Sequence, residues 1–545
     1  MVIGKRSLLT LGGTALLVSL VPSLRLPYTP RVAFIAAASA QRAEAIPSEA
    51  GDRLFAADKF AQARDAYLQA IKHSPSDPHL REGLVKCLSR LDDWQQALSE
   101  SQKTVTVTPQ NADGHGLLAL ALLRAGQPVG AERETVRALE LDPQSYYGLV
   151  ARGRLQLWEG QKTQACATLR RAVGLRPNDP DAWFYITDSQ EDDVTDELLK
   201  DIDMYAALKP KGHPHDLAME TVPSLRSYLT NFINDSPYHA DIPVSEAQLK
   251  TADAGDTPPV TFTTPFTRSG NYVVMPALLN NAPMRFLFDT GGGFSIALNK
   301  KAADRTTLKA LGKSFVRGVS GRETSIEAKA ETMKVGDETF RAIPVDILSG
   351  DTGDEDGVFG VSNFDHYAVT IDYTTKRLLL ARGKTASAPT PEPGRHTVQL
   401  PFHLLGGDII IPITVDGRDV WALVDTGADA EVILSLEVAR SLSIRRKPGS
   451  YAVHTLNARL GLGNTVKKQT VLLFRDPVDM RLGDMDGKPF VTHIQPAFGA
   501  DLLDTQVDPA SMFQIGAIVG INFLNKAARV TFDYPHRLLT LEYAR

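Results

Sequence analysis

The chain has 545 residues, of which 43% are hydrophobic and 23% charged, and its formal net charge is −5. This length suggests three or four domains, and the composition is that of globular proteins rather than of disordered, fibrous or wholly membrane-embedded chains. The small net charge supplies no basic field for nucleic acid, so the sequence predicts no nucleic-acid partner.

The N-terminus has the pattern of an export signal. Lys5 and Arg6 precede a mostly apolar run from Leu8 to Val21, which is short for a membrane span and suits the core of a signal peptide. A second apolar stretch ends in Ala38-Ser39-Ala40, a small-x-small cleavage pattern. We predict that residues 1–40 direct the protein to the periplasm or outside the cell. Because the segment is long, an uncleaved membrane anchor is the alternative.

A period of 34 residues runs through the first half of the chain. It is marked by two columns: Pro75, Pro109, Pro143 and Pro177, and Ala63, Ala97, Ala131 and Ala165. A small residue lets two helices approach closely, and proline cannot continue a helix, so the columns describe a repeated helix–turn–helix unit. The pattern resembles the tetratricopeptide repeat family. It predicts an α-solenoid over residues 44–210, with four full units and a degenerate fifth.

The function of the predicted repeats is open between two alternatives. Such arrays expose a concave groove that binds a peptide or helix of a protein partner, but the array could also serve as a scaffold that packs on the second half. Cys87 and Cys166 fall in predicted helices more than two repeats apart, so we predict buried free thiols rather than a disulfide. Residues 211–260 are predicted to hold a helix around Pro223–Ile233 and then a linker.

The second half contains a duplicated β domain. Val273–Pro276 matches Ile409–Pro412, and with no gap Phe286–Gly291 matches Ala422–Gly427, both at an offset of 136 residues. Short apolar strands and turn pairs indicate an all-β structure. We predict one lobe at 261–383, a Pro-rich linker at 384–396 and a second lobe at 397–545. Pairing of the lobes within one chain and pairing between two chains both remain open.

Each lobe has an apolar strand that runs into Asp-Thr-Gly, at Asp289-Thr290-Gly291 and at Asp425-Thr426-Gly427. Each has a later apolar pair followed by glycine, at Gly360 and Gly520. This combination resembles the retropepsin-like aspartic proteases. A third triplet, Asp351-Thr352-Gly353, follows no apolar strand and is predicted to lie in a surface loop, so the bare triplet carries little weight.

The resemblance implies a role for each motif residue. Asp289 and Asp425 would form a catalytic dyad that shares one proton, so that one carboxylate activates a water and the other protonates the peptide group. Thr290 and Thr426 would hydrogen-bond across the lobe interface, Gly291 and Gly427 would permit the sharp turn, and Gly360 and Gly520 would buttress the aspartate loops. The acid–base division is the established behaviour of aspartic-protease dyads.

Two features leave activity open. Gly292 and Gly293 stand where the family more often has Ser, Thr or Ala, which would loosen the first loop. The second lobe has about 24 extra residues, which we place around Pro477–Ser511 and which could cover or extend the cleft.

Candidate flaps over the substrate are Gly318–Gly321 and Gly461–Gly463, with ordinary hairpin turns as the alternative.

The sequence therefore predicts an exported aspartic endopeptidase that acts on protein or peptide substrates, with the repeats recruiting a substrate or partner. The alternative is a catalytically inactive peptide-binding protein of the same fold. No cofactor is predicted. No metal site is predicted either, because zinc motifs are absent and the Asp-rich turns at Asp354 and Asp484 lack the closing glutamate of a calcium loop.

Overall fold

A computed structural model describes most of the chain from residue 47 onward. The described residues are 47–189, 195–234, 239–240, 260–292, 296–318, 321–350, 354–360, 367–382, 394–405, 407–447, 449–459, 466–485, 488–495, 497–500 and 513–544. Contacts divide the chain into Met1–Glu44 and one compact unit, Ala45–Arg545. The predicted signal segment, the third Asp-Thr-Gly triplet and most of the linker between the lobes lie outside the described residues.

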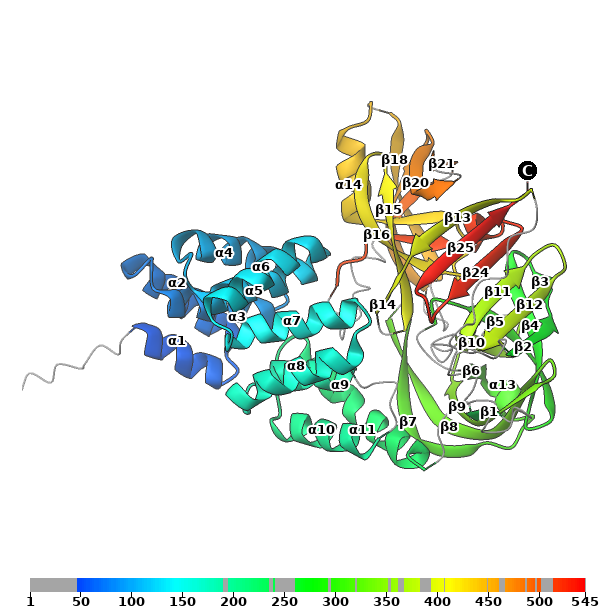
Figure 1. The fold of residues 1–545 in the computed structure, drawn as a ribbon, viewed down its shortest axis with the longest axis horizontal. Coiled ribbons are helices and arrows are strands. Elements are labelled where there is room, and N and C mark those ends of the chain that lie inside the picture. The colour runs from blue at the N-terminus through cyan, green and yellow to red at the C-terminus, as the bar shows by residue number, and fades with distance from the viewer. Residues whose placement is uncertain are drawn as a thin grey trace, which may run out of the picture. The chain divides into compact units, whose positions relative to one another are not determined.

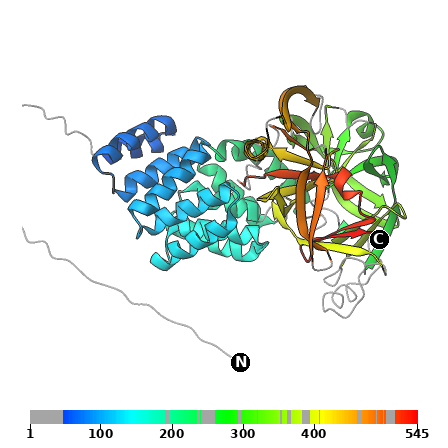
Figure 2. The ribbon, with the colours of Figure 1, turned by 90° about the horizontal axis from the view of Figure 1, so that it is seen from above.

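The first half folds into successive antiparallel helix pairs, which lie side by side in chain order (Figures 1 and 2). Four first helices begin at residues 78, 112, 146 and 180, which reproduces the 34-residue period. The pairs are α1 (Pro47–Ala56) with α2 (Phe60–His73), α3 (Pro78–Arg90) with α4 (Trp94–Val107), α5 (Ala112–Arg124) with α6 (Pro128–Leu141), α7 (Tyr146–Trp158) with α8 (Lys162–Leu175), and α9 (Pro180–Ser189) with α10 (Asp196–Ala207).

The repeat columns have the physical role that the sequence predicts. Ala63, Ala131 and Ala165 are fully buried and Ala97 is 3% exposed, so the helices of each pair touch at these positions. Each column proline lies two residues beyond a helix end, as Pro75 does after α2, where it stops the helix from continuing. Of the two cysteines, Cys87 is buried as predicted, whereas Cys166 is partly exposed, and neither forms a disulfide.

The array ends in α11 (His215–Phe232), which begins eight residues before the predicted start at Pro223. Pro223 lies inside the helix rather than at its beginning. Val222, Leu229 and Phe232 are buried, so packing against the array holds the helix on both sides of the proline. Within the predicted linker, β1 (His239–Ala240) pairs with a strand of the first lobe. Among the described helices, none is long and apolar enough to cross a membrane.

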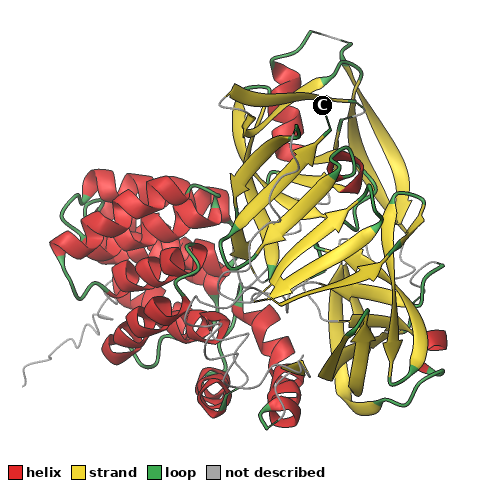
Figure 3. Cartoon of the chain, turned by 45° about the vertical axis from the view of Figure 1, so that its right-hand side comes forward, coloured by secondary structure: helices red, strands yellow, loops and turns green. Residues whose placement is uncertain are grey.

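The second half consists of two β lobes (Figure 3). The first contains β2 (Val260–Pro265), β3 (Thr267–Ser269), β4 (Tyr272–Leu279), β5 (Ala282–Asp289), β6 (Ile296–Asn299), α13 (Lys300–Ala303), β7 (Lys309–Gly318), β8 (Gly321–Val335), β9 (Glu338–Leu348), β10 (Gly357–Gly360), β11 (Tyr367–Asp372) and β12 (Arg377–Arg382).

The second lobe repeats this order with additional strands. It contains β13 (His396–Pro401), β14 (His403–Leu405), β15 (Asp408–Val415), β16 (Arg418–Asp425), β17 (Val432–Ser435), α14 (Leu436–Ile444), β18 (Tyr451–Arg459), β19 (Val466–Phe474), β20 (Val478–Met485), β21 (Lys488–Ile494), β22 (Phe498–Ala500), β23 (Ala517–Gly520), α15 (Ile521–Leu524), β24 (Arg529–Asp533) and β25 (Leu538–Tyr543).

The lobes join within one chain through a shared antiparallel sheet. Its strands follow the order β2-β12-β11-β24-β25-β13, so the contribution of one lobe mirrors that of the other. At the centre β11 pairs with β24, where Thr370 lies opposite Thr531 and their hydroxyl oxygens are 2.8 Å apart. This pairing answers the question of intramolecular or intermolecular assembly that the sequence leaves open.

The extra residues of the second lobe are spread over several places rather than gathered at Pro477–Ser511. Part lengthens the helix after the aspartate loop, since α14 has 9 residues and α13 has 4. Part lengthens the β18–β19 hairpin, and part lies between β22 and β23. The prediction of one insertion was wrong because the sequence comparison fixes only the total difference between two shared motifs.

Candidate active site

The two aspartates lie at the ends of two equivalent β-hairpins. β4 pairs with β5 and β15 with β16, each strand has eight residues, and Asp289 and Asp425 are the last residues of β5 and β16. The two-residue turns, Asn280-Asn281 and Asp416-Gly417, all have positive φ, between 44° and 77°. Such turns match the twist of a hairpin and fix its register. Both aspartates are thus held at corresponding ends of rigid ladders.

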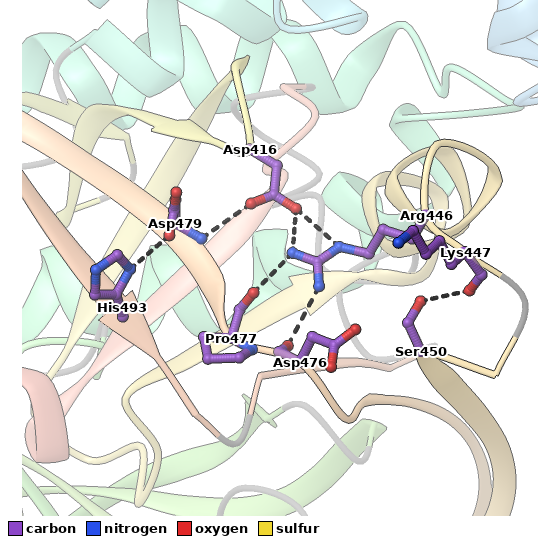
Figure 4. A network of polar contacts seen from close by, with 8 residues as sticks. All are labelled: Asp416, Arg446, Lys447, Ser450, Asp476, Pro477, Asp479 and His493. Atoms are coloured by element: carbon purple, nitrogen blue, oxygen red, sulfur yellow. Dashed lines mark hydrogen bonds and ion pairs between the residues drawn. The ribbon is translucent and has the colours of Figure 1, made fainter.

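The turn at the far end of each hairpin is tied to the strand beside it. The Asn280 side chain accepts a hydrogen bond from the Thr332 N–H at 2.9 Å, and the Asp416 side chain accepts one from the Asp479 N–H at the same distance. In the second lobe Arg446 adds an ion pair with Asp416 and donates to the Pro477 carbonyl (Figure 4). These contacts immobilise the hairpin that ends in Asp425.

The two threonines of the triplets form a reciprocal set of hydrogen bonds between the lobes. The Thr290 hydroxyl donates to the Val424 carbonyl at 2.8 Å and accepts from the Thr426 N–H at 3.0 Å. The Thr426 hydroxyl donates to the Phe288 carbonyl and accepts from the Thr290 N–H, both at 2.9 Å. Both threonines are buried, so these four bonds form away from water. They hold the two loops face to face.

The glycines of the triplets make room for the opposite aspartate. A Cβ added to Gly291 would lie 2.5 Å from Cγ of Asp425, and one added to Gly427 would lie 2.6 Å from an Asp289 carboxylate oxygen. A side chain at either glycine would therefore displace the opposite carboxyl group. Each glycine N–H also donates to the aspartate of its own loop, Gly291 to Asp289 at 2.9 Å and Gly427 to Asp425 at 2.7 Å.

The later glycines lie beside the aspartates in the sheet. β10 runs parallel to β5 with Gly360 paired to Asp289, and β23 runs parallel to β16 with Gly520 paired to Asp425. A Cβ on Gly520 would meet the carbonyl oxygens of Ala428 and Ala430, which belong to the aspartate loop. The sequence motifs Val358–Gly360 and Ile518–Gly520 therefore form the strand that backs each loop.

The two carboxyl groups hydrogen-bond to each other, and the two residues that carry them are partly exposed. Burial raises the pKa of Asp289, although its hydrogen bond with Asp425 and two backbone N–H groups counteract the rise. Burial and the charge of Asp289 raise the pKa of Asp425 well above its usual range. The pair therefore holds one proton and one negative charge over a wide pH range.

Three residues near the dyad, Asn271, Tyr272 and Asp408, belong to none of the sequence motifs. Asn271 donates to the Asp429 carboxylate at 3.0 Å across the lobes. The pKa of Tyr272 is raised by burial and by the charges of Asp429, Asp425 and Asp289, and the charge of Asp408 contributes to the raised pKa of Asp425. The duplication could have indicated Tyr272 and Asp408, because they occupy equivalent positions of the two lobes at the 136-residue offset.

The structure describes the strands of both candidate flap hairpins, β7–β8 and β18–β19. Of the predicted tips, Val319-Ser320 and Gly461–Gly463 lie outside the described residues. The β20–β21 hairpin pairs with β15 at Thr414 and Val415, which are at the opposite end of that strand from the dyad. This part of the second lobe therefore does not cover the aspartates. No group of three or more potential metal ligands occurs among the described residues.

The repeat array contacts the second lobe around Trp158. This indole stacks between the rings of His403 and Phe513, with ring centroids 3.9 and 4.5 Å away. His403 Nδ1 donates to the Trp158 carbonyl at 2.8 Å, and Trp421 Nε1 donates to the Gly126 carbonyl at 3.1 Å. Phe513 begins the segment that leads directly into β23, so the residues just after the predicted insertion pack against the repeats.

The repeats also enclose a small cavity of about 60 Å³ between their first helices. Its lining includes four basic side chains, Lys86, Arg90, Arg124 and Arg154, and two acidic ones, Asp92 and Asp181. Arg90 pairs with Asp181 at 2.7 Å and Arg124 with Asp92 at 3.3 Å, and the lining holds more basic than acidic side chains.

Comparison with known proteins agrees with this architecture. Residues 275–362 and 411–487 match the family model for aspartyl proteases, and residues 54–121 match a tetratricopeptide repeat model. The chain combines tetratricopeptide repeats with two aspartyl protease-like lobes. The two protease matches each contain one of the aspartates described above.

Two similar curated proteins each match a limited part of the chain. The E3 ubiquitin-protein ligase CHIP of Arabidopsis thaliana is 30% identical over 107 residues, which are 20% of this chain and 37% of that protein. The Hsp70-Hsp90 organizing protein of Triticum aestivum is 28% identical over 142 residues, 25% of this chain and 24% of that one. The chain thus spans well under half the length of either relative.

Solved structures with partial similarity each cover about a third of this chain. A thermophilic TPR protein of Thermus thermophilus is 22% identical, covering 33% of this chain and 96% of its own with a TM-score of 0.28. The MamA protein is 19% identical, covering 30% and 90% with a TM-score of 0.22.

Proposed function

We propose that the protein is an aspartic endopeptidase whose dyad is Asp289 and Asp425. The observation that carries this proposal is the hydrogen-bonded pair of carboxyl groups, held by the reciprocal threonine bonds. Asp289 receives more N–H donation and acts as the carboxylate that removes a proton from water. Asp425 retains the proton and donates it to the peptide group. Thr290, Thr426 and the four glycines are positioning residues.

Cleavage of a mixed peptide library by the purified protein, from acid to neutral pH, tests this function. We expect the parent to cleave and Asp289→Asn and Asp425→Asn each to lose at least about a thousandfold in kcat/KM, because neither carboxyl alone performs both proton transfers. Asp351→Asn, in the third Asp-Thr-Gly, is the matched control and should retain parental activity. A parent that never cleaves, or variants as active as the parent, would favour the inactive peptide-binding alternative.

We further propose that the repeat groove recruits a protein substrate or partner through an acidic segment. The excess of basic side chains in the cavity supports this choice of chemistry. Fluorescence anisotropy with an Asp/Glu-rich peptide should give a Kd that is about tenfold weaker for Lys86→Glu than for the parent. Lys103→Glu, an exposed lysine of α4 outside the cavity, is the control. Equal binding by both variants would refute this proposal.

We also propose that the protein is exported, on the basis of the basic and apolar pattern of residues 1–40. Cell fractionation followed by N-terminal sequencing tests it. A mature N-terminus near Gln41 outside the cytoplasm is expected, whereas an intact N-terminus in the membrane fraction would indicate the anchor, and a cytoplasmic protein would contradict export.

A further inference from the structure

The dyad is flanked by two residues that differ between the lobes. In the β15–β16 ladder Ile410 pairs with Leu423. Asp408 lies two residues before Ile410, at the start of β15, and Asp425 lies two residues after Leu423, at the end of β16. In the β4–β5 ladder Val274–Leu287 is likewise two residues from Tyr272 and Asp289. Residues opposite each other in a ladder share a face of the sheet, with Cβ atoms about 5 Å apart. When each register is continued by two residues beyond the last pair, Asp408 falls opposite Asp425 and Tyr272 opposite Asp289.

Electrostatic coupling supports this placement. The charge of Asp408 acts on Asp425, and Tyr272 is coupled to both aspartates of the dyad and to Asp429. Both residues are partly exposed at the dyad, and one of the two carboxylate oxygens of Asp408, Oδ1, is buried.

The carboxylate beside the dyad comes from a different element near Tyr272 than near Asp408. At the 136-residue offset Tyr272 corresponds to Asp408, and Asp429 corresponds to Gly293. On the Tyr272 side the carboxylate belongs to the loop, where Asn271 already donates to Asp429. In the first lobe the sequence position equivalent to Asp429 is a glycine, which has no side chain, and on the Asp408 side the carboxylate comes from the strand. Each side thus holds one carboxylate, but the Tyr272 side adds an aromatic ring and its carboxylate accepts a hydrogen bond from Asn271.

We propose that Asp408 determines specificity, by selecting peptides with a lysine or arginine side chain in the subsite beside Asp425. This proposal rests on the proposed peptidase function. A cation there would face Asp408 and a dyad that retains one negative charge, whereas an acidic side chain would be repelled by both. The subsite beside Tyr272 would take an uncharged side chain, for which an aromatic ring provides apolar contact.

Matched peptides that carry lysine or norleucine at each position around the scissile bond test the proposal. The parent should prefer lysine over norleucine at one position by about tenfold in kcat/KM, the effect of a partly buried ion pair. In Asp408→Asn this ratio should fall to near one, and the alkaline limb of the pH profile should move to lower pH, because the pKa of Asp425 falls. Asp419→Asn removes an exposed charge near the turn of the same hairpin and should keep the parental ratio.

A parent that cleaves without a lysine preference, or an Asp408→Asn variant that keeps it, would overturn the proposal while leaving the peptidase function intact. If no peptide is cleaved, the proposed peptidase function is wrong. Binding of the same peptides, measured by calorimetry, then still tests whether the subsite beside Asp425 selects a basic side chain. A lysine peptide should then bind the parent about tenfold more tightly than its norleucine counterpart, and Asp408→Asn should abolish the difference. Equal binding would refute the subsite.

Discussion

At the scale of single residues, Gly291 is held tightly against the opposite aspartate of the dyad. Its Cα faces the carboxylate of Asp425 so closely that a methyl group would lie 2.5 Å from Cγ. Gly291→Ala should therefore push the aspartates apart and lower kcat/KM by at least about a hundredfold, a loss typical of misplaced catalytic groups. Peptide cleavage measures it. Gly174→Ala is the control, because nothing lies within 4 Å there and alanine favours the α8 helix. Equal activity of Gly291→Ala and parent would contradict the geometry.

The raised pKa values of the dyad predict a dependence of stability on pH. A carboxyl group whose folded pKa is raised stabilises the fold below its unfolded pKa, and this contribution is lost as pH rises through the folded pKa. Asp425→Asn, which cannot ionise, should therefore melt at a higher temperature than the parent near pH 7 and at a similar temperature near pH 3.5. Each unit of raised pKa corresponds to about 1.4 kcal/mol. A difference in Tm that does not change with pH would contradict this prediction, and Asp419→Asn is the exposed control.

The sequence predicts the motif residues of the site but not their neighbours. Asp289, Asp425, both threonines and both glycines follow from a pattern in which each residue type has a backbone or proton-transfer role. Asn271, Tyr272 and Asp408 have no such constraint, since many side chains fit at the beginning of a strand. The register of the hairpins brings Tyr272 and Asp408 toward the dyad, and a contact between the lobes positions Asn271.

At the scale of strands and loops, the reciprocal threonine bonds join the lobes. Thr290→Val would leave the Val424 carbonyl and the Thr426 N–H without a partner in a buried place, at a cost of about 2–4 kcal/mol in the free energy of unfolding. Thr290→Ser keeps the hydroxyl and should retain most of the parental stability. Denaturant unfolding with both variants measures the difference, and equal losses in the two would attribute the effect to packing instead.

Element lengths were harder to predict than element types. The residues that recur every 34 positions predict the helix pairs of the repeats. The alanines mark contacts between helices, and the prolines mark helix ends. The start of α11 was misplaced because proline is usually a boundary, whereas burial of residues on both sides of Pro223 overrides that preference. The extra residues of the second lobe have no periodic pattern, so their distribution over a helix, a hairpin and a loop could not be predicted.

At the scale of the whole molecule, Trp158 connects the repeats to the second lobe. The equivalent positions one and two repeats earlier are Arg124 and Arg90, so the change to tryptophan marks the unit that docks. Trp158→Ala removes the stacking on His403 and Phe513 and should cost about 3–5 kcal/mol. In calorimetry we expect the unfolding of the repeats and of the lobes to separate into two transitions. Val129→Ala, at a residue that is 76% exposed, should leave the profile unchanged.

The shared sheet has a consequence for how the protein must be synthesised. If translation stopped in the linker after the first lobe, β11 would present an open hydrogen-bonding edge where β24 normally pairs. Such edges recruit strands from other molecules. A truncated product would therefore tend to self-associate through the surface that its own second lobe covers, so that a ribosome pausing between the lobes leaves an aggregation-prone nascent chain until the last strands emerge.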